Sequence, residues 1–425
     1  MAPPKSVVIV GGSIAGLLHG LYLKRHGSNV VILEQDRKHI RSSHNAGICF
    51  GPAAEELLRK YDDTGRQASI PSVATRIAYR KCEEFKNINA RRNNTSWGLM
   101  YRILRANFDG FASDAVPDPP LPRDGDGRAE YLSGRRVIEL QYGKDQKDGG
   151  VTVWYLEKDD KRSSITADLV IGADGLHSTI RTLVEAPTRK EYAGYVAWRG
   201  TLLESELSDD VADYFQRRMT LNLLSRSYIV IYVIPQDAGS FELGSRLINW
   251  VWYHNFSDSS PELAEVLTDI NGHTHGNTVP VGMVRPEIWK RYLAARIGSM
   301  AAPVARLIGK TEKVFVTKVN DALCEKAVYH HGRIILVGDA LTTFRPHLAV
   351  ATEQGARHCL GLGKVWDGEI SIDQWEREAT GHARKIWLLS RVLGVWWLEG
   401  WREFLGVFWL CVVESVSLFR GFLMK

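Results

Sequence analysis

Small residues follow the first apolar run of the chain and could hold a phosphate group. Residues 7–20 read VVIVGGSIAGLLHG, so Gly11, Ser13 and Gly16 occupy the first, third and sixth positions of a six-residue turn. A turn of this kind at a helix start offers free backbone N–H groups and the positive end of the helix dipole to a diphosphate. Glu34 ends the next apolar run, where a carboxylate can accept hydrogen bonds from ribose hydroxyls. These residues predict a dinucleotide site.

The third position of this turn departs from the usual glycine. Ser13 carries a small side chain that narrows the approach only slightly, and its hydroxyl can donate a hydrogen bond to a phosphate. Glu34 fits a ribose without a phosphate, which disfavours NADP in this loop and leaves both FAD and NAD open. The competing interpretation is an ordinary glycine-rich turn, but strand, turn, helix, strand and terminal acid together favour the dinucleotide.

The elements that must position these residues are those of an α/β protein. Apolar runs at residues 6–10 and 29–33 predict buried strands joined by a helix over residues 14–26, and another strand is predicted at residues 333–337 before Gly338-Asp339. The middle of the chain is rich in β-branched and aromatic residues, which favour strands. Further strands are predicted at residues 151–157, 165–171, 228–234 and 246–253, a surface loop at 114–128, and helices from residue 353 onward.

The composition is that of a soluble globular protein. The chain has 425 residues, 44% of them hydrophobic and 24% charged, and this length predicts two domains. The net charge of +5 comes from scattered basic residues, so we expect no nucleic-acid partner. The five cysteines are widely spaced without a Cys-x-x-Cys pair, which favours a reducing compartment over zinc or disulfides. No signal peptide fits before Val7, so we expect a cytoplasmic protein.

Two later motifs resemble those of a known family. Residues 168–181 read DLVIGADGLHSTIR and residues 334–347 read IILVGDALTTFRPH. Together with the loop at Gly11 they are similar, in order and spacing, to the three fingerprints of the class A FAD-dependent monooxygenases, the p-hydroxybenzoate hydroxylase fold. The resemblance extends to about residue 385. Segments at residues 95–108, 195–200 and 246–255 look like those of dihydroxypyridine hydroxylases and related fungal FAD monooxygenases.

The resemblance implies a Rossmann-like FAD-binding domain with an inserted β-rich substrate domain and a C-terminal helical region. The expected parts are an FAD-binding domain over residues 1–185, a β-rich substrate domain over 186–325, a return to the FAD-binding domain over 326–385, and an apolar helical tail over 386–425. The FAD-binding residues that the resemblance implies are Gly11, Ser13, Gly16, Glu34, Gly47, Arg102, Asp174, Asp339, Ala349 and Ala351.

The sequence departs from the family pattern at Thr342, at two alanines and at Trp97. Thr342 stands where a histidine usually follows the Gly-Asp motif, and Ala349 and Ala351 replace two glycines. An arginine that usually reaches FAD falls at Trp97 when the helix is aligned by its apolar spacing. The neighbouring Arg102 is therefore the candidate for that contact.

The implied reaction is hydroxylation of an electron-rich aromatic or heteroaromatic molecule with NAD(P)H and O2, through a flavin C4a-hydroperoxide. Arg199 and Tyr232 are the candidate catalytic residues, because they could hold a phenolate substrate near the flavin. The competing interpretation makes them an arginine that bridges strands and a core tyrosine. His347 is either a proton relay or a helix cap. His273 and His275 are interpreted as loop residues, and no metal site is expected.

Other functions remain open at the level of the sequence. A flavin-free NAD dehydrogenase and a membrane-tethered flavoprotein that no longer hydroxylates are the alternatives to the monooxygenase. The tail over residues 386–425 is rich in tryptophan, but its uncharged run is too short to span a membrane. It either packs on the protein or forms a homodimer contact, or it attaches the chain to a membrane surface.

Overall fold

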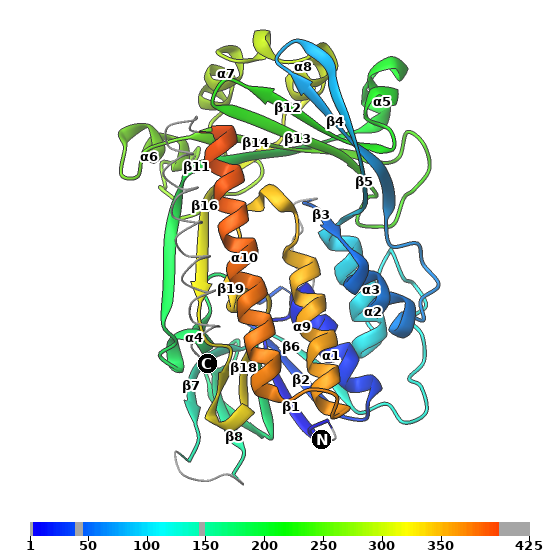
Figure 1. Cartoon of the computed structure of the whole chain (residues 1–425), viewed down its shortest axis with the longest axis vertical. Helices are drawn as coiled ribbons and strands as arrows, with labels where there is room; N and C mark the ends of the chain where they lie inside the picture. The colour runs from blue at the N-terminus through cyan, green and yellow to red at the C-terminus, as the bar shows by residue number, and fades with distance from the viewer. Residues whose placement is uncertain (1–2, 39–45, 144–148, 399–425) are drawn as a thin grey trace, which may run out of the picture.

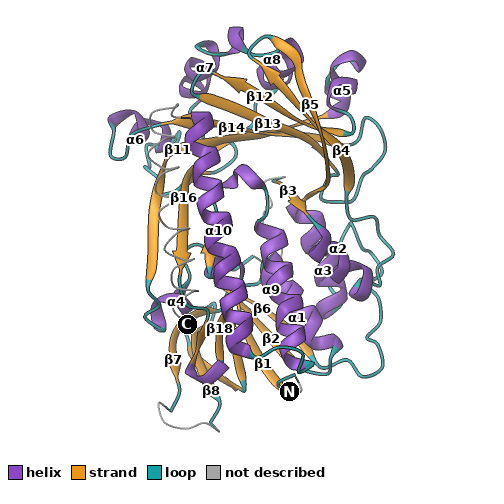
Figure 2. Ribbon diagram, viewed as in Figure 1, coloured by secondary structure: helices purple, strands orange, loops and turns teal. Residues whose placement is uncertain are grey.

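The structure is a computed structural model that describes residues 3–38, 46–143 and 149–398 (Figure 1). Two sheets dominate it, with helices packed beside them (Figure 2). The α/β class expected from the sequence is confirmed.

A six-stranded sheet contains the first motif. Its order is β17-β18-β10-β1-β2-β6, and the pairs among β18, β10, β1, β2 and β6 are parallel. Parallel strands buried on both faces read as continuous apolar runs, as these do. The strands span Ser6–Val10 (β1), Asn29–Glu34 (β2), Ala129–Ser133 (β6), Leu169–Gly172 (β10), Val328–Tyr329 (β17) and Ile334–Leu336 (β18).

Four helices pack together beside this sheet. They are α1 (Ile14–Arg25), α2 (Pro52–Tyr61), α3 (Trp97–Asp109) and α9 (Ala351–Trp366), and Figure 2 shows them side by side. The carboxylate of Glu353 in the first turn of α9 accepts hydrogen bonds from the N–H groups of Gly51, Ala53 and Ala54 at the start of α2. This contact satisfies the free donors of one helix with an acid from another.

A curved ten-stranded sheet lies above the helices in Figure 2. Its order is β15-β16-β11-β14-β13-β12-β4-β5-β3, with β19 paired to β16. Trp198, Trp250 and Trp252 are fully buried on this sheet and pack around Trp289 of α7. The strands span Gly47–Phe50 (β3), Ile70–Tyr79 (β4), Cys82–Ser96 (β5), Thr188–Leu203 (β11), Arg218–Leu224 (β12), Ser227–Ile234 (β13), Leu247–Asn255 (β14), Thr278–Val279 (β15), Val314–Cys324 (β16) and Thr342–Thr343 (β19).

The expected division of the chain needs a correction here. Strands β3, β4 and β5 fall within residues 1–185, yet they belong to the ten-stranded sheet, where β4 pairs in parallel with β12. Residues 186–325 therefore do not supply the whole sheet. The local sequences of β4 and β5 do not specify which partner strand they join.

The strand predicted at residues 165–171 is in fact two strands. Residues Arg162–Ala167 form β9 in a small sheet with β7 (Arg136–Gln141) and β8 (Val151–Leu156), whereas Leu169–Gly172 forms β10. Between them, the carboxylate of Asp168 accepts hydrogen bonds from the N–H and hydroxyl groups of Ser6. This contact turns the chain from one sheet into the other.

The last described helix is α10 (Ile372–Leu398), which crosses the face of both sheets in Figure 1. Trp387, Val395 and Leu398 are buried, so residues 386–398 of the predicted tail pack on the protein. The remainder, residues 399–425, lies outside the described residues. Among the described helices, none has both the length and the apolar content needed to cross a bilayer. The remaining helices span Thr179–Leu183 (α4), Asp209–Phe215 (α5), Pro261–Leu267 (α6), Pro286–Ala294 (α7) and Ala302–Lys310 (α8).

The two alanines that replace glycines have different conformations. Ala349 follows the short 3-10 turn η5 (Pro346–Leu348) and has a φ of +52°, in the left-handed region. Helix α9 begins at Ala351, two residues before the helical region expected from residue 353 onward. A side chain in the left-handed region costs about 1–2 kcal/mol, whereas glycine adopts it freely.

We therefore predict opposite effects of glycine at these two positions. Ala349→Gly should stabilise the protein by about 0.5 kcal/mol, because relief of the left-handed strain exceeds the extra entropy of the unfolded chain. Ala351→Gly should destabilise it by about 0.5 kcal/mol, because glycine weakens a helix. The midpoints of urea unfolding of the two apoproteins measure the difference. A lower urea midpoint for Ala349→Gly than for Ala351→Gly would contradict the left-handed conformation of Ala349.

Candidate cofactor and substrate site

The turn after β1 leaves no room for a side chain at Gly11 or Gly16. Gly11 has a φ of +102°, and a methyl carbon placed on it would lie 2.5 Å from the carbonyl oxygen of Ala173. A methyl carbon on Gly16 would lie 2.0 Å from the carbonyl oxygen of Gly11. Both contacts are too short for any side chain, so the turn requires glycine at its first and sixth positions. The resulting close approach leaves the N–H groups at the start of α1 open to a diphosphate.

A first cavity of about 210 Å³ lies at the carboxyl ends of β1, β2 and β10. Gly11, Ser13, Glu34 and Asp174 line it together, although they come from three separate segments. Glu34 is buried, and its Oε2 accepts a hydrogen bond of 2.9 Å from the N–H of Gly12. Glu34 thus already holds the turn in place, in addition to the ribose contact that the sequence predicts.

Asp174 shapes the adjoining loop. Its carboxylate accepts hydrogen bonds from the Ser178 hydroxyl (2.5 Å) and from the N–H groups of Thr179 (2.6 Å) and Ile180 (3.1 Å). Burial raises the pKa of this carboxyl, and the three hydrogen bonds oppose that shift. The side chain therefore organises the loop, while its role toward a cofactor stays a prediction.

Trp97 and Arg102 lie on the same helix, α3, but have different partners. Trp97 Nε1 donates a hydrogen bond of 3.2 Å to Ser13 Oγ, so the residue at the usual arginine position does contact the turn. Arg102 lies outside both cavities described here, and its guanidinium forms ion pairs with Asp114 (2.9 Å) and Asp237 (3.3 Å). Arg102 is therefore not among the residues that this structure brings to the cofactor, because two carboxylates already neutralise it.

A second cavity of about 410 Å³ lies between the ten-stranded sheet, the segment 344–352 and helix α10. It gathers residues that the sequence assigned to the cofactor and to the substrate; those residues are Gly47, Arg199, Tyr232, Asp339, Ala349 and Ala351. The N–H of Gly47 donates to Asn249 Oδ1 at 3.1 Å. This cavity also includes Arg92 of β5 and Cys49 of β3, which sequence reasoning missed although Gly47 of β3 was among the predicted residues.

Asp339 is the carboxylate of the second cavity. Burial raises its pKa to about 6, and its Oδ1 has no hydrogen-bond partner within the described part of the chain. A buried acceptor without a donor is costly unless a ligand supplies one. The hydroxyl groups of FAD would supply such donors, so Asp339 fits the cofactor that the resemblance implies.

Arg199 and Tyr232 line the same cavity from β11 and β13. The charge of Arg199 opposes the rise that burial causes in the pKa of Tyr232 and of Tyr253, so it lies near both phenols. Arg199 Nε is buried without a hydrogen-bond partner among the described residues. Tyr232 contacts the Cys49 thiol, whose pKa burial raises to about 12. The permanent cation of Arg199 thus lies in the cavity near neutral hydroxyl and thiol groups.

His347 is held between two phenols. Tyr195 bonds its Nε2 at 2.6 Å, and Tyr228 bonds its Nδ1. Burial and the nearby charge of Arg345 lower the pKa of His347 to about 3, so the imidazole is neutral near pH 7. Both tyrosines are fully buried, and this argues against a proton path to solvent through them. His347 is thus better described as a neutral positioning group than as a proton relay or a helix cap.

A buried ion pair fixes the walls of the second cavity. Asp321 of β16 is fully buried and accepts from Arg345 Nε at 2.7 Å, one residue before η5. Trp387 and Arg391 of α10 contact the other oxygen of Asp321 at 3.2 Å and 3.6 Å. One carboxylate thereby joins a strand of the large sheet, the segment that carries Ala349, and the last described helix.

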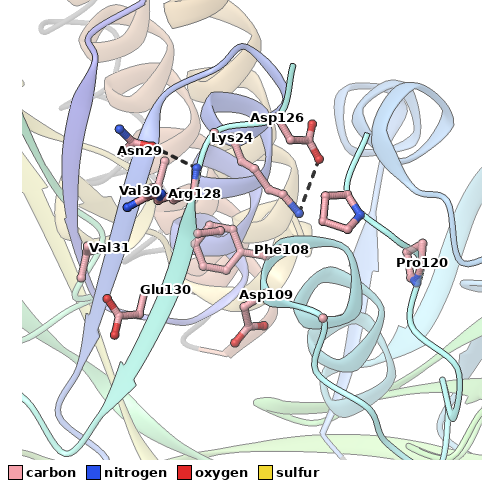
Figure 3. A pocket seen from close by; sticks show the side chains of 14 residues that line it. Lys24, Asn29, Val30, Val31, Phe108, Asp109, Pro120, Asp126, Arg128 and Glu130 are labelled. Atoms are coloured by element: carbon pink, nitrogen blue, oxygen red, sulfur yellow. Dashed lines mark hydrogen bonds and ion pairs between the residues drawn. The ribbon is translucent and has the colours of Figure 1, made fainter. Parts of the chain in front are cut away.

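A larger cavity, of about 790 Å³, lies at the opposite edge of the six-stranded sheet, where β2 and β6 begin (Figure 3). Two of its charged groups are paired with each other: Lys24 lies 3.6 Å from Asp126 and also donates to the carbonyl of Asn107. Ligands of open α/β sheets bind at the carboxyl ends of the strands. This cavity lies at the other ends, so its size does not make it the cofactor site.

Glu34 accepts a hydrogen bond from the N–H of Gly12 and is predicted to accept others from the ribose of FAD. Its replacement distinguishes these two roles. Glu34→Ala should weaken FAD binding by about tenfold or more, because charge-assisted hydrogen bonds contribute about 1.5–3 kcal/mol each. Binding of FMN, which lacks the adenosine half, should change much less. Flavin fluorescence titration of the apoprotein measures both constants. Equal losses for FAD and FMN would indicate that Glu34 supports only the turn and does not contact the ribose.

Replacement of Asp339 should have opposite effects on stability and on binding. The raised pKa disfavours the folded apoprotein above pH 6, and this penalty disappears as the pH falls toward the ordinary pKa of 3.8. Asp339→Asn should therefore stabilise the apoprotein at pH 7.5, by on the order of 3 kcal/mol, and by about half as much at pH 5. FAD retention should fall about tenfold. Thermal unfolding at the two pH values and the flavin content of the purified protein check these outcomes. A gain in stability that does not change with pH would show that the pKa of Asp339 is not raised in the folded apoprotein.

Comparison with known proteins found a matching family model and similar sequences. A family model described as FAD binding domain-like matches residues 192–321. A 2,6-dihydroxypyridine 3-monooxygenase of Paenarthrobacter nicotinovorans is 29% identical over 386 residues, which cover 89% of this chain and 88% of the relative.

Solved structures show the same fold. The 2,6-dihydroxypyridine-3-hydroxylase of Arthrobacter nicotinovorans aligns with a TM-score of 0.76 and 26% identity, covering 94% of this chain and 95% of that one. Klebsiella pneumoniae HpxO, solved with FAD and uric acid, aligns with a TM-score of 0.69 and 18% identity, covering 98% and 95% of the two chains. In its sequence and in its fold, the chain is thus similar to FAD-dependent monooxygenases.

Proposed function

We propose that this protein uses NAD(P)H and O2 to hydroxylate an electron-rich aromatic or heteroaromatic small molecule. One observation carries the proposal. The second cavity brings Asp339 and the Ala349 segment, which are expected at the flavin, together with Arg199 and Tyr232, which are expected at the substrate. FAD, when bound, would take up electrons from the nicotinamide and activate oxygen for transfer to the substrate.

The residues of the cavity suit an anionic aromatic substrate. Arg199 is a permanent cation, and Tyr232 is a neutral phenol that can donate to the same substrate oxygen. An ionised hydroxyl raises the electron density of an aromatic ring, which favours attack by an electrophilic oxygen. The apolar walls, made by side chains such as Met219, Leu221 and Trp397, keep water away from the reacting atoms.

The names of the relatives support this substrate class. Two are hydroxylases of dihydroxypyridine, and one was solved with uric acid. Both compounds are heteroaromatic and carry acidic groups. The proposal transfers to this chain only the shared chemistry, a planar ring with an ionisable oxygen, and not the identity of either compound.

We predict that Arg199→Ala and Tyr232→Phe retain FAD but lose coupling. Both residues lie away from the glycine turn, so cofactor content should stay within about twofold of wild type, whereas hydrogen peroxide should replace product. Loss of Arg199 should mainly raise KM, by about tenfold or more, because a charged hydrogen bond is removed. Loss of Tyr232 should mainly lower kcat. Product mass, NAD(P)H oxidation and peroxide release are measured over a panel of phenols, hydroxypyridines and hydroxyindoles.

Two variants on β11 serve as matched controls. Arg189→Ala removes an exposed arginine, and Tyr192→Phe removes a hydroxyl that bonds the Phe256 carbonyl outside the cavity. Both should keep wild-type coupling. Full product yield in the Arg199 and Tyr232 variants would show that the substrate is held elsewhere. A purified protein without flavin would favour the dehydrogenase, and a yellow protein without ligand-dependent NAD(P)H oxidation would favour the non-hydroxylating flavoprotein.

A further inference from the structure

Two buried histidines lie behind the motifs that are assigned to FAD. His19 belongs to α1 and His358 to α9, and both side chains are buried. The two helices lie side by side (Figure 2), and the Cys359 thiol contacts the carbonyl oxygen of Leu18 at 3.6 Å. Cys359 and Leu18 adjoin the two histidines in sequence, so the imidazoles lie close to this contact between the helices.

His358 bonds the Gly-Asp motif. The N–H of Gly338 donates a hydrogen bond of 3.1 Å to His358 Nδ1. Gly338 has a φ of +55° and lies against α1, where a methyl carbon placed on it would be 2.9 Å from the Cβ of Ala15. The next residue is Asp339, which lines the second cavity and has a carboxylate oxygen without a partner among the described residues. His358 therefore fixes the backbone from which Asp339 extends.

His19 bonds the glycine turn at the start of the chain. Its Nδ1 lies 2.7 Å from the carbonyl oxygen of Ala15, one turn earlier on α1. Ala15 is the fifth of the six residues from Gly11 to Gly16 that form this turn. Each histidine therefore contacts the backbone of a different FAD motif.

These two bonds decide which nitrogen of each ring carries the proton. A carbonyl oxygen only accepts, so His19 Nδ1 is protonated and its Nε2 is an acceptor. A backbone N–H only donates, so His358 Nδ1 is the acceptor and its Nε2 carries the proton. Burial lowers the pKa of His19 to about 4 and, together with nearby His19, His382 and Arg357, that of His358 to about 3. Both rings are therefore neutral near pH 7.

The other nitrogen of each ring is buried without a partner. His19 Nε2 and His358 Nε2 form no hydrogen bond with any described residue. One of them is an acceptor and the other a donor, and leaving either unsatisfied is costly. A water molecule that accepts from His358 Nε2 and donates to His19 Nε2 satisfies both. In the described part of the chain, no three potential metal ligands gather in one place, so water suits this pair better than a metal ion does.

We propose that His19 and His358 are positioning residues that join the two FAD-binding motifs through one buried water molecule. The hydrogen bonds then run in one direction, from the Gly338 N–H to His358, through the water to His19, and on to the Ala15 carbonyl. This chain keeps the glycine turn and Asp339 in register for one FAD molecule. The inference concerns the cofactor and does not depend on which substrate is hydroxylated.

Amide substitutions separate the two bonds of His358. Asparagine places an amide atom near the position of Nδ1, and glutamine places one near that of Nε2. His358→Gln should bind FAD about tenfold or more weakly than wild type, because the buried Gly338 N–H loses its acceptor. His358→Asn keeps an acceptor there and loses only the bridge, so its affinity should fall by about threefold. Flavin fluorescence titration of the apoproteins measures these constants. Equal affinities of the two variants would overturn the role of His358.

A second substitution tests the bridge itself. His19→Asn keeps a donor for the Ala15 carbonyl and removes the acceptor for the water, so FAD affinity should again fall by about threefold. The double variant His19→Asn/His358→Asn should bind FAD as each single variant does, because both changes remove the same bridge. Losses that multiply to about ninefold, or wild-type affinity in either single variant, would show that no bridge joins the rings.

His254 provides the control for the loss of a histidine. It lies on β14 of the large sheet, and its Nδ1 also has no hydrogen-bond partner in the described ranges. His254→Asn should leave FAD affinity unchanged, since this ring contacts neither FAD motif. An equal loss of FAD in this variant would reduce the two buried histidines to general supports of the fold.

The tautomers are measured on the wild-type holoenzyme, so this test does not depend on the folding of a variant. Nitrogen NMR of protein labelled at histidine should show the proton on Nε2 of His358 and on Nδ1 of His19 at pH 7. The signals that disappear in His358→Asn and His19→Asn identify the two rings. A proton on the other nitrogen of either ring would overturn the proposed chain of hydrogen bonds.

Discussion

The pair between Asp321 and Arg345 holds the parts of the second cavity together. Asp321 belongs to the ten-stranded sheet, Arg345 precedes the turn that leads to α9, and Trp387 and Arg391 bring α10 to the same carboxylate. A buried charge is costly to leave unpaired, so these three elements cannot separate without a large loss of free energy. The pair also neutralises one arginine of the cavity and so leaves the other two as the charges that a ligand can meet.

The cavity concentrates polar groups that the folded chain leaves without partners. Asp339 Oδ1 and Arg199 Nε are both buried without hydrogen bonds to described residues. In a structural core, such groups would reduce stability without any compensating interaction. In a binding site they are positioned before the ligand arrives, so the ligand does not have to order them. The same groups therefore lower the stability of the free protein and select the chemistry of what binds.

The departures from the family pattern have local partners. Ser13, in place of glycine, accepts a hydrogen bond from Trp97, which itself stands at the usual arginine position. Thr342, in place of histidine, lies buried in β19, and its carbonyl accepts a hydrogen bond from Gln354 of α9. Ala349 keeps the left-handed backbone that a glycine would adopt more easily. Each of these positions thus has its own local contact or backbone conformation in this structure.

The sequence by itself determined the α/β class, the turn at Gly11 with Glu34 and the motifs around Asp174 and Asp339, because each depends on spacing within a short segment. Only the tertiary structure placed β3 to β5 in the large sheet, engaged Arg102 with two aspartates, and brought Arg92 into the cavity with Arg199. Those contacts join residues far apart in the chain, and strand patterns do not specify which distant partner a strand will meet.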